Sequence, residues 1–512
     1  MVRLRLTSPN HADVIVAGAG PAGSAAAARL AAGGARVLLL DQRAFPRDKV
    51  CGDFVGPTAL VELEALGVTA RPDYATTNIV RHAALFLDGR ELIRRPLPEV
   101  EELPAYGRCI PRVLLDSWLV EASRAAGAQV MEGWRVAGFD VDNDGVVVHA
   151  EHAGERVDLR SRLLIGADGS SSLVGRELRG ASPADENRII AVRGYYEGVK
   201  GPADRADLCF SGGSFPGYYW LFPTAATEAN VGVGMLLETW PPTADHLKSL
   251  LLDLVAKDPA LKARLDGAQL RGKVVGWPLT TYDPRLPLVS DRVMLVGDAA
   301  GFINPLNGEG IQYALVSGRW AAETALPCLA EDDCSSRSLM PYADRCQRDL
   351  RYDMALAGLI VQFIRNRHLN GVWLEALKVI AARARVDEEY AHIASGILAG
   401  ISPARDALSI KVVRRTIDQA FYSTILALAW NALKGPGHLT HRGVDLARGM
   451  AATATTLLTD PAALMEWVVG LAKQSGELAL QFSGHLVDER RLLELPPPLH
   501  PATAHVRIAG AS

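Results

Sequence analysis

The stretch DVIVAGAGPAGSAAAARLAAGGARVLLLDQR, residues 13–43, limits the possible folds of this 512-residue chain more than any other part of it. Residues 14–16 form a short, uninterrupted apolar run, which is typical of a parallel strand buried on both faces. The alanine-rich run at 25–32 predicts a helix, and residues 36–40 predict a second strand. A strand, a glycine-rich turn, a helix and a strand in this order predict an α/β fold.

The turn between the first strand and the helix has the spacing Gly-x-Gly-x-x-Gly, formed by Gly18, Gly20 and Gly23. The first glycine permits a tight turn, the second lets a pyrophosphate approach the backbone, and the third lets the helix pack closely on the strand. Asp41 ends the second strand, where a carboxylate can bind ribose hydroxyl groups. The unit predicts a dinucleotide site and leaves FAD and NAD(P) open. Its candidate cofactor-binding residues are Gly18, Gly20, Ala22, Gly23, Asp41, Gln42 and Arg43.

Two later segments indicate that the dinucleotide is FAD. SRLLIGADGSSSLVGREL (161–178) and DRVMLVGDAAGFINPLNGEGIQYAL (291–315) each contain an apolar strand that ends near an aspartate. Asp298 is placed to accept hydrogen bonds from a polyol chain. The loop at 304–310 is expected to direct backbone N–H groups and a helix N-terminus at the ligand, which would stabilise the negative charge of a reduced flavin. These segments add the candidates Asp168, Asp298, Gly308, Gly310 and Ile311.

The motifs GAGPAG, GADG and VGDAAGFINPLNGEGI, taken together, resemble those of FAD-dependent oxidoreductases of the p-hydroxybenzoate hydroxylase type. FPRDKVCGD (45–53) and YYWLFP (218–223) make the chain similar, more narrowly, to the geranylgeranyl reductase family. The resemblance implies that Cys51-Gly52 lies near the flavin and that Tyr218, Trp220 and Phe222 line the substrate cavity. It also implies that Arg112, in IPRVLLDSWL, belongs to a flavin-contacting helix start. It covers about residues 10–340.

One position departs from the pattern of many flavin hydroxylases. Those enzymes have an arginine seven residues after the aspartate of the GADG segment, whereas this chain has Gly175 there and Arg176 next. The difference weakens the hydroxylase interpretation of this segment.

The aromatic run YYWLFP is expected to be a strand whose alternating side chains point to opposite faces. Tyr218, Trp220 and Phe222 would then share one face, as a substrate wall or as ordinary core. Cys51 follows Arg47 and Lys49, cations expected to lower the pKa of its thiol, although a lone cysteine is usually a small buried hydrophobe. The candidate catalytic residues are Cys51, Tyr218 and Trp220, and the candidate substrate-binding residues are Tyr218, Trp220 and Phe222.

The nucleotide-binding segments are separated in sequence, which predicts an interleaved architecture. Residues 1–80, 105–185 and 270–345 are expected to form a Rossmann-like FAD-binding domain. Residues 81–104 and 186–269 are expected to form a mixed or antiparallel substrate-binding sheet, with a hairpin at Asp88-Gly89. Residues 346–512 have helical spacing of apolar residues and predict a helical domain with a Pro-rich tail. Packing, capping of the cavity, dimerisation and contact with a membrane surface all remain possible roles of that domain.

Composition limits the binding partners and the cellular location that we expect. The net charge of -4 and the absence of a dense Lys/Arg stripe argue against nucleic-acid binding. The six cysteines form no CxxC pair and no zinc-like spacing, so we expect neither a metal site nor a disulfide framework, and a cytoplasmic location. No run reaches the roughly 18–20 apolar residues of a transmembrane helix. The N-terminus lacks the apolar region of a signal peptide. Peripheral membrane contact stays open.

The nucleotide-binding motifs and the family resemblance together imply an FAD-dependent oxidoreductase acting on a bulky apolar small molecule of polyprenyl, polyene or polyketide type. Reduction of a C=C bond is the favoured reaction, with Tyr218 or Cys51 as the proton donor. A flavin monooxygenase that hydroxylates or epoxidises a natural product, and an FAD-bound non-redox cyclase of a polyene, are the alternatives. The chain has no second nucleotide-binding glycine motif. Electrons are therefore expected from transiently bound NAD(P)H or from an external electron donor.

Overall fold

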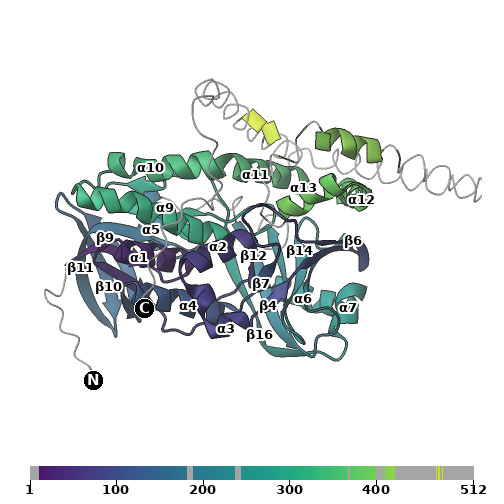
Figure 1. Ribbon diagram of the computed structural model, residues 1–512, viewed down its shortest axis with the longest axis horizontal. Helices are drawn as coiled ribbons and strands as arrows, with labels where there is room; N and C mark the ends of the chain where they lie inside the picture. The colour runs from purple at the N-terminus through teal and green to yellow at the C-terminus, as the bar shows by residue number, and fades with distance from the viewer. Residues whose placement is uncertain are drawn as a thin grey trace, which may run out of the picture.

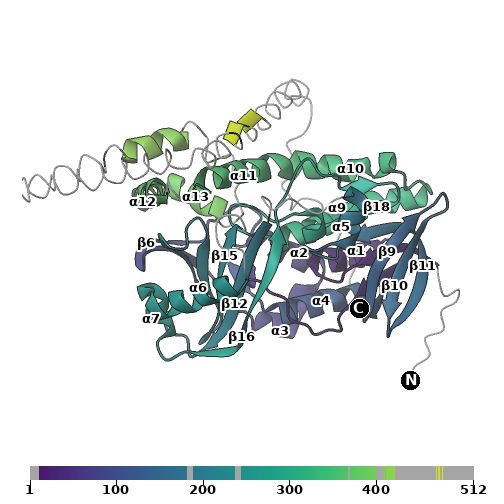
Figure 2. The same cartoon turned by 180° about the vertical axis from the view of Figure 1, so that it is seen from behind.

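The computed structural model describes residues 11–180, 188–236, 244–366, 370–398 and 400, together with 411–420 and short stretches between 406 and 476. Figures 1 and 2 show two large sheets lying beside each other and a layer of helices running along one side of both. The predicted combination of a Rossmann-like α/β unit, a second mixed sheet and C-terminal helices is confirmed.

The first sheet has a parallel centre with antiparallel strands at its periphery. Its main path runs β17, β18, β11, β1, β2, β8, and β10 joins β9 to β11. The pairs β18–β11, β11–β1, β1–β2 and β2–β8 are parallel. The strands span β17 Val289–Ser290, β18 Val293–Leu295, β11 Glu155–Gly166, β1 His11–Ala17, β2 Val37–Asp41, β8 Gln129–Glu132, β9 Trp134–Val141 and β10 Val146–His152.

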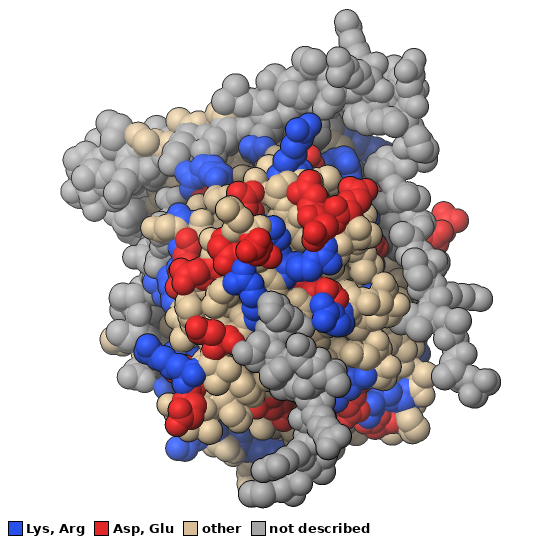
Figure 3. All heavy atoms as spheres, turned by 90° about the vertical axis from the view of Figure 1, so that its left-hand side faces the viewer, with Lys and Arg blue, Asp and Glu red and all other residues tan. Residues whose placement is uncertain are grey.

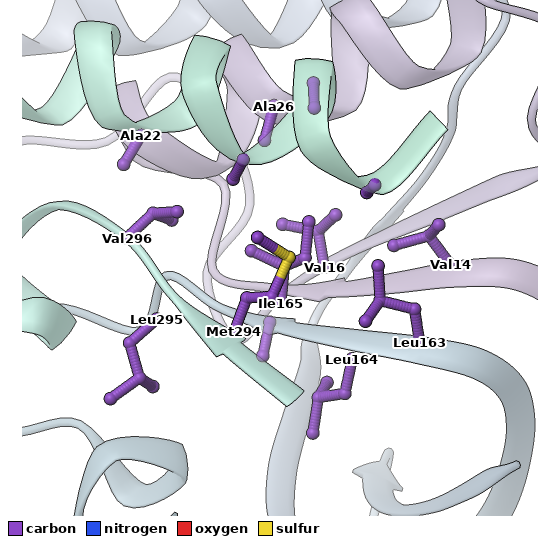
Figure 4. Close-up of a cluster of buried hydrophobic side chains, with 14 of the residues drawn as sticks. Val14, Val16, Ala22, Ala26, Leu163, Leu164, Ile165, Met294, Leu295 and Val296 are labelled. Carbon is purple, nitrogen blue, oxygen red and sulfur yellow. The ribbon is translucent and has the colours of Figure 1, made fainter. Parts of the chain in front are cut away.

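The core of this sheet explains the apolar runs in the sequence. Leu39, Val16, Ile165 and Met294 lie opposite one another on successive parallel strands, and all four are fully buried. Figure 4 shows Val14, Val16, Leu163 and Ile165 with Met294 beneath the helix that carries Ala22 and Ala26. Strands covered on both faces need apolar side chains at every position, so apolar and polar residues do not alternate along them.

Helix α1 (Pro21–Ala32) lies against α9 (Ile311–Ala330) and α4 (Arg112–Ala125). The approach to α9 is so close that a Cβ added at Gly318 would lie 2.4 Å from the carbonyl oxygen of Ala22. The small residues of α1 are therefore a packing requirement. The other helices near this sheet are α2 Pro57–Ala65, α3 Pro72–Ala75, α5 Leu173–Arg179, α8 Gly297–Ala300 and α10 Ser336–Cys346.

The second sheet has the order β16, β12, β15, β14, β13, β5, β6. The strands are antiparallel except for the parallel pair β13–β5. The hairpin expected at Asp88-Gly89 is confirmed, because both residues have positive φ (48° and 73°) between paired β5 and β6. The bounds are β16 Gln269–Thr280, β12 Arg188–Glu197, β15 Glu228–Leu236, β14 Tyr218–Ala225, β13 Arg205–Phe210, β5 His82–Leu87 and β6 Arg90–Pro96, with helices α6 Ala244–Lys257 and α7 Pro259–Leu265 beside them.

The second sheet extends past the domain boundary expected at residue 270. Strand β16 pairs antiparallel with β12 along most of its length, so residues 270–280 lie in the second sheet and not in the nucleotide-binding unit. The apolar segment before β18 carries no signal of which sheet it joins, because strand pairing is a non-local choice. A small sheet of β3 (Phe54–Val55), β7 (Gly107–Cys109) and β4 (Asn78–Val80) is also present.

Helices α11 (Tyr352–Ile364), α12 (Asn370–Val386) and α13 (Glu388–Leu398) follow the nucleotide-binding unit. Figures 1 and 2 place α12 and α13 at the β6 end of the second sheet, where Arg95 on β6 pairs with Glu388 at 2.6 Å. The predicted Pro-rich tail lies outside the described residues. None of the helices described is long and apolar enough to cross a lipid bilayer.

Charged side chains of both signs share the surface near β9 and β10. On the face in Figure 3, basic and acidic groups are interspersed. The ion pair Arg135–Glu151 joins β9 to β10, and Arg160–Asp142 joins β11 to the turn after β9. Mixed, mutually paired charges of this kind produce little net field over a surface.

Candidate functional site

The sequence-predicted cofactor residues gather at one edge of the first sheet. Gly18 follows β1, Asp41 ends β2, Asp168 follows β11, and Asp298 lies just beyond β18. These four strands are adjacent and parallel, so their carboxyl ends meet at the same edge. Ligands of open α/β sheets bind outside this edge, where the strand order reverses.

The three motif glycines have different structural roles. A Cβ at Gly18, which has φ +104°, would lie 2.3 Å from the Ala167 carbonyl oxygen, and one at Gly23 would lie 1.9 Å from the Gly18 carbonyl oxygen. Both positions are therefore required by the fold. At Gly20 the nearest atom would be Nη2 of Arg47, 4.0 Å away. Gly20 thus leaves open space at the helix start.

The ends of two helices fit an anionic cofactor. Helix α1 begins at Pro21 with Gly20 as its N-cap, and no side chain caps its N–H groups. Helix α9 begins at Ile311 with Gly310 as its N-cap, also without a side-chain cap. Uncapped helix N-termini carry partial positive charge and free donors. Together with the space at Gly20, these termini fit the diphosphate and the isoalloxazine edge of FAD.

Asp41 is buried and already binds its own loop. Its Oδ2 accepts a hydrogen bond from the Ala19 N–H at 2.9 Å, and its Oδ1 accepts from the Arg43 N–H at 2.9 Å. The residues Gln42 and Arg43 are exposed beside it. Asp41 therefore stabilises the glycine turn in addition to any contact with a ribose.

Arg112 starts α4 and lies in a buried ion-pair chain. Its guanidinium donates to both carboxylate oxygens of Asp116, at 2.6 and 2.8 Å. Arg47 donates to the same Asp116 at 2.9 Å and lies 3.5 Å from Asp41. These ion pairs connect the start of α4 to Asp41 beside the glycine turn, and the fully buried Asp116 needs both cations.

Asp168 and Asp298, the aspartates of the two later segments, differ in how free their carboxylates are to bind a ligand. Asp168 accepts hydrogen bonds from the Ser172 hydroxyl and from the N–H groups of Leu173 and Val174, so its carboxylate holds the start of α5. Asp298 accepts from the Ser170 hydroxyl at 3.2 Å and lies 3.9 Å from Nζ of Lys49. Its side chain keeps 21% exposure. Asp298 is the better placed of the two for a ligand.

Tyr218 connects the two sheets at the helix α9 loop. Its hydroxyl donates to the Asn307 carbonyl oxygen at 2.5 Å. A Cβ at Gly308, which has φ +71°, would lie 3.4 Å from the same hydroxyl oxygen. Burial raises the pKa of Tyr218 above its usual value, so the hydroxyl keeps its proton. Gly308 thus brings the loop directly under β14.

The aromatic strand β14 presents one face to this loop. Ring centroids of Tyr218 and Trp220 lie 5.9 Å apart, and those of Trp220 and Phe222 lie 6.1 Å apart. Tyr219 and Leu221 point the other way and are fully buried in the second sheet's core. The alternation predicted for this strand is present, and Tyr218, Trp220 and Phe222 form one continuous wall, the aromatic wall.

The turn 51–53, hereafter the Cys51 turn, lies against the aromatic wall. A Cβ at Gly52 would lie 3.2 Å from the Phe222 ring and 3.7 Å from Nε1 of Trp220. Trp220 also lies over Gly232 of β15, where an added Cβ would come within 2.2 Å of the indole. Residues distant in sequence therefore meet here.

The thiol of Cys51 differs from the sequence-based expectation. Arg47 and Lys49 were expected to lower its pKa, but burial raises the pKa of the Cys51 thiol, against the opposing effect of Arg112. Arg47 is paired with Asp116 and Asp41, and Lys49 lies beside Asp298. The neighbouring cations are thus partly neutralised by carboxylates, and desolvation dominates.

We expect Cys51 to react slowly with iodoacetamide at pH 7–8, because alkylation needs the thiolate and burial disfavours it. Labelling of intact FAD-loaded protein, followed by peptide mass spectrometry, measures the rate. Free cysteine at the same pH is the reference. Labelling at or above the rate of free cysteine would contradict a raised pKa.

Three polar residues of the site have no motif that identifies them. Buried Asp53, at the end of the Cys51 turn, forms a hydrogen-bonded group with buried Asn230 and half-buried Tyr195. The only sequence signal is a polar Asn inside the apolar strand segment ANVGVG. Burial raises the pKa of Asp53 to about 6, although hydrogen bonds from Tyr195 and Asn230 lower it.

The raised pKa of Asp53 predicts a pH-dependent stability. The unfolded carboxyl ionises near 3.8 and the folded one near 6, so Asp53 favours folding below pH 3.8 and loses that contribution as pH rises through 6. The neutral variant Asp53→Asn should therefore gain up to about 3 kcal/mol relative to the parent between pH 3.8 and pH 7. Urea unfolding at several pH values measures this difference. A difference that is constant with pH would contradict the assignment.

Comparisons with known proteins agree with this geometry. The FAD binding domain family matches residues 11–193. The chain is 35% identical over 329 residues to a menaquinone reductase of Mycobacterium tuberculosis, covering 61% of this chain and 76% of that protein. It is 33% identical over 369 residues to digeranylgeranylglycerophospholipid reductase 2 of Methanopyrus kandleri, covering 70% of this chain and 89% of that protein.

A solved structure shares the fold. The geranylgeranyl bacteriochlorophyll reductase-like protein of Thermoplasma acidophilum superposes with a TM-score of 0.63 at 24% identity, covering 82% of this chain and 99% of that one. At this identity the likeness concerns the fold alone.

Proposed function

Because this chain belongs to the geranylgeranyl reductase family of FAD-dependent oxidoreductases, we propose that it reduces carbon–carbon double bonds in a polyprenyl chain. The observation that carries the proposal is the contact between the Cys51 turn and the aromatic wall, beside the uncapped start of α9. Reduction of an apolar chain needs such a wall, since aromatic side chains offer large apolar surfaces with few polar groups.

The two relatives support this substrate class. One is a menaquinone reductase and the other a digeranylgeranylglycerophospholipid reductase, and the molecules in both names carry polyprenyl chains. The head groups differ while the chain chemistry is shared. We therefore assign the polyprenyl part of the substrate, and not its head group, as the part that this site recognises.

The cofactor would be held by the residues at the sheet edge. Gly20 and the start of α1 would take the diphosphate, Asp41 the ribose, Asp298 the polyol chain, and the start of α9 the flavin ring edge. When bound and reduced, FAD supplies the hydride chemistry. NAD(P)H, bound transiently, or an external electron donor would reduce it.

The residues of this chain would orient the alkene and supply a proton. Trp220 and Phe222 would hold the chain by apolar contact. Cys51 would hold the proton, because its thiol stays neutral, whereas the Tyr218 hydroxyl is already bound to the Asn307 carbonyl. Of the two donors predicted from the sequence, Cys51 therefore fits the geometry better.

The proposal is tested under anaerobic conditions with FAD-loaded protein reduced by dithionite. Menaquinone, a digeranylgeranylglycerophospholipid and geranylgeranyl diphosphate are offered separately. After any quinol has been reoxidised to the quinone in air, mass spectrometry of the products should show a gain of two hydrogen atoms for each double bond reduced. The three substrates distinguish the head groups. Separate assays with NADH and NADPH then test whether either can replace dithionite.

Two outcomes would overturn the proposal. In a parallel aerobic assay with NAD(P)H, incorporation of label from isotopic oxygen gas would identify a monooxygenase. A product of unchanged mass, formed with oxidised FAD and no reductant, would identify a non-redox cyclase. Both alternatives are thereby separated from a reductase in one set of assays.

A further inference from the structure

Asp53 is a fully buried carboxyl at the end of the Cys51 turn. Its Oδ2 accepts hydrogen bonds from the Tyr195 hydroxyl at 2.7 Å and from Nδ2 of Asn230 at 2.8 Å. Its Oδ1 is also buried and has no hydrogen-bond partner among the described residues. A buried polar group in this state costs stability.

Asn230 connects Asp53 to the aromatic wall. Its Nδ2 donates both to Asp53 and to the Cys51 carbonyl oxygen, the latter at 2.7 Å, and its Oδ1 accepts from Nε1 of Trp220 at 2.9 Å. The orientation of the amide follows from its partners, because an indole N–H can only donate and a carbonyl can only accept. Asn230 is fully buried and uses its polar atoms in these contacts.

The Asn230 amide joins two parts of the site that are 179 residues apart in sequence. The Cys51 turn belongs to the nucleotide-binding unit, while Trp220 and Asn230 belong to neighbouring strands of the second sheet. Gly52 and Phe222 approach so closely beside the amide that a Cβ at Gly52 would lie 3.2 Å from the ring. A small displacement of the Cys51 turn would therefore change its spacing from Trp220 and Phe222 of the aromatic wall.

We propose that Asp53 and Asn230 are positioning residues, which hold the Cys51 turn at a fixed distance from Trp220 and thereby set the fit of the substrate chain. The effect on substrate fit rests on the proposed function. The positioning of the Cys51 turn does not, because it involves only residues of this protein. Asp53 acts through Asn230 and the backbone of Cys51. Neither residue is assigned a contact with the reacting atoms.

The backbone of Asp53 dictates which variants are informative. Its φ of +65° lies in the left-handed region, which asparagine and glycine tolerate and branched residues do not. Asp53→Gly removes the carboxyl without straining the turn. Asp53→Asn keeps an oxygen that can accept from Tyr195 and Asn230. Asn230→Ala removes the connecting amide.

Tyr219→Phe is the matched control. Tyr219 is also on β14, and its hydroxyl donates to buried Asp258 at 2.6 Å, but on the opposite face of the sheet. The variant deletes a buried hydrogen bond between a tyrosine hydroxyl and an aspartate, the kind that Tyr195 makes with Asp53. It leaves the Cys51 turn unchanged. A general effect of loosening the sheet would appear in this control.

The first measurement is the rate at which iodoacetamide alkylates Cys51 in FAD-loaded protein, which needs no substrate. We expect Asp53→Gly and Asn230→Ala to raise the rate at least about fivefold by releasing the turn, and Asp53→Asn and Tyr219→Phe to leave it within about twofold. If the double variant Asp53→Gly/Asn230→Ala raises the labelling rate no more than either single variant does, the two residues act as one connected unit. Unchanged labelling in both disrupting variants would overturn the proposal.

The second measurement is steady-state kinetics with the polyprenyl substrate that the parent enzyme reduces. Asp53→Gly and Asn230→Ala should raise KM at least about tenfold with a smaller change in kcat, and Asp53→Asn should restore KM to within about twofold of the parent. Faster labelling without a change in KM would overturn the link to substrate. If the parent reduces no polyprenyl substrate, the proposed function fails, and the labelling pattern alone decides whether Asp53 and Asn230 position the turn.

Discussion

Replacement of Gly20 by valine is expected to give a folded protein that no longer retains FAD. Gly20 has φ -75° and ψ -175°, an extended conformation that valine adopts readily, and no protein atom lies closer than 4.0 Å to an added Cβ. The branched side chain would instead fill the space in which the diphosphate approaches the start of α1. Flavin occupancy should fall at least about tenfold, equivalent to about 1.4 kcal/mol or more of binding free energy.

Absorbance of the purified protein near the flavin band, with thermal unfolding of the apoprotein, measures this effect. Gly18→Ala is the contrasting variant, because its Cβ would overlap the Ala167 carbonyl at 2.3 Å and its φ is +104°. That variant should lose stability as well as flavin. Full flavin occupancy in Gly20→Val would remove the basis for placing the diphosphate at this turn.

Trp220→Ala is expected to keep FAD and to impair the use of polyprenyl substrates. Trp220 is 6% exposed, lies over Gly232 and donates to Asn230, so its loss opens the aromatic wall and releases the amide that holds the Cys51 turn. We expect kcat/KM to fall at least about tenfold, mostly through KM. The free energy of unfolding should fall by about 3–5 kcal/mol, which is usual for Trp→Ala at buried positions.

Leu221→Ala separates the loss of substrate binding from the loss of stability. Leu221 is the neighbour of Trp220 on β14 and is fully buried on the opposite face. Its truncation should cost about 2–5 kcal/mol of stability while KM stays near that of the parent. Loss of flavin in Trp220→Ala, or an equal rise of KM in Leu221→Ala, would place the aromatic strand in the cofactor shell or the core.

Prediction from sequence worked best for features carried by contiguous residues. The glycine turn, the alternation of Tyr218 and Tyr219 along β14, and the hairpin at Asp88-Gly89 all follow from local spacing. Strand pairing was harder to predict. Residues 270–280 were expected in the nucleotide-binding unit, whereas β16 joins the second sheet through β12. Nothing in the apolar pattern of a strand specifies its partner, since pairing depends on side-chain packing across the sheet.

The chemistry of single side chains depended on burial and partners. Asp168 and Asp298 look alike in sequence, yet one carboxylate holds the start of α5 and the other stays partly exposed. Cys51 follows two cations, yet its thiol pKa is raised. Asp53 had no motif at all, and its pKa of about 6 arises from complete burial beside Tyr195 and Asn230.

The sequence by itself determined the dinucleotide site, because a strand, a glycine turn and a helix N-terminus are built from neighbouring residues whose geometry needs no distant partner. The contiguous motifs at 161–178, 291–315, 45–53 and 218–223 then indicated FAD and the family. Only the tertiary structure decided which acids remain available, what the Cys51 turn contacts, and how Asn230 joins that turn to Trp220. Those properties arise from desolvation and hydrogen bonding between segments far apart in the chain, and such contacts exist only once both sheets have packed together.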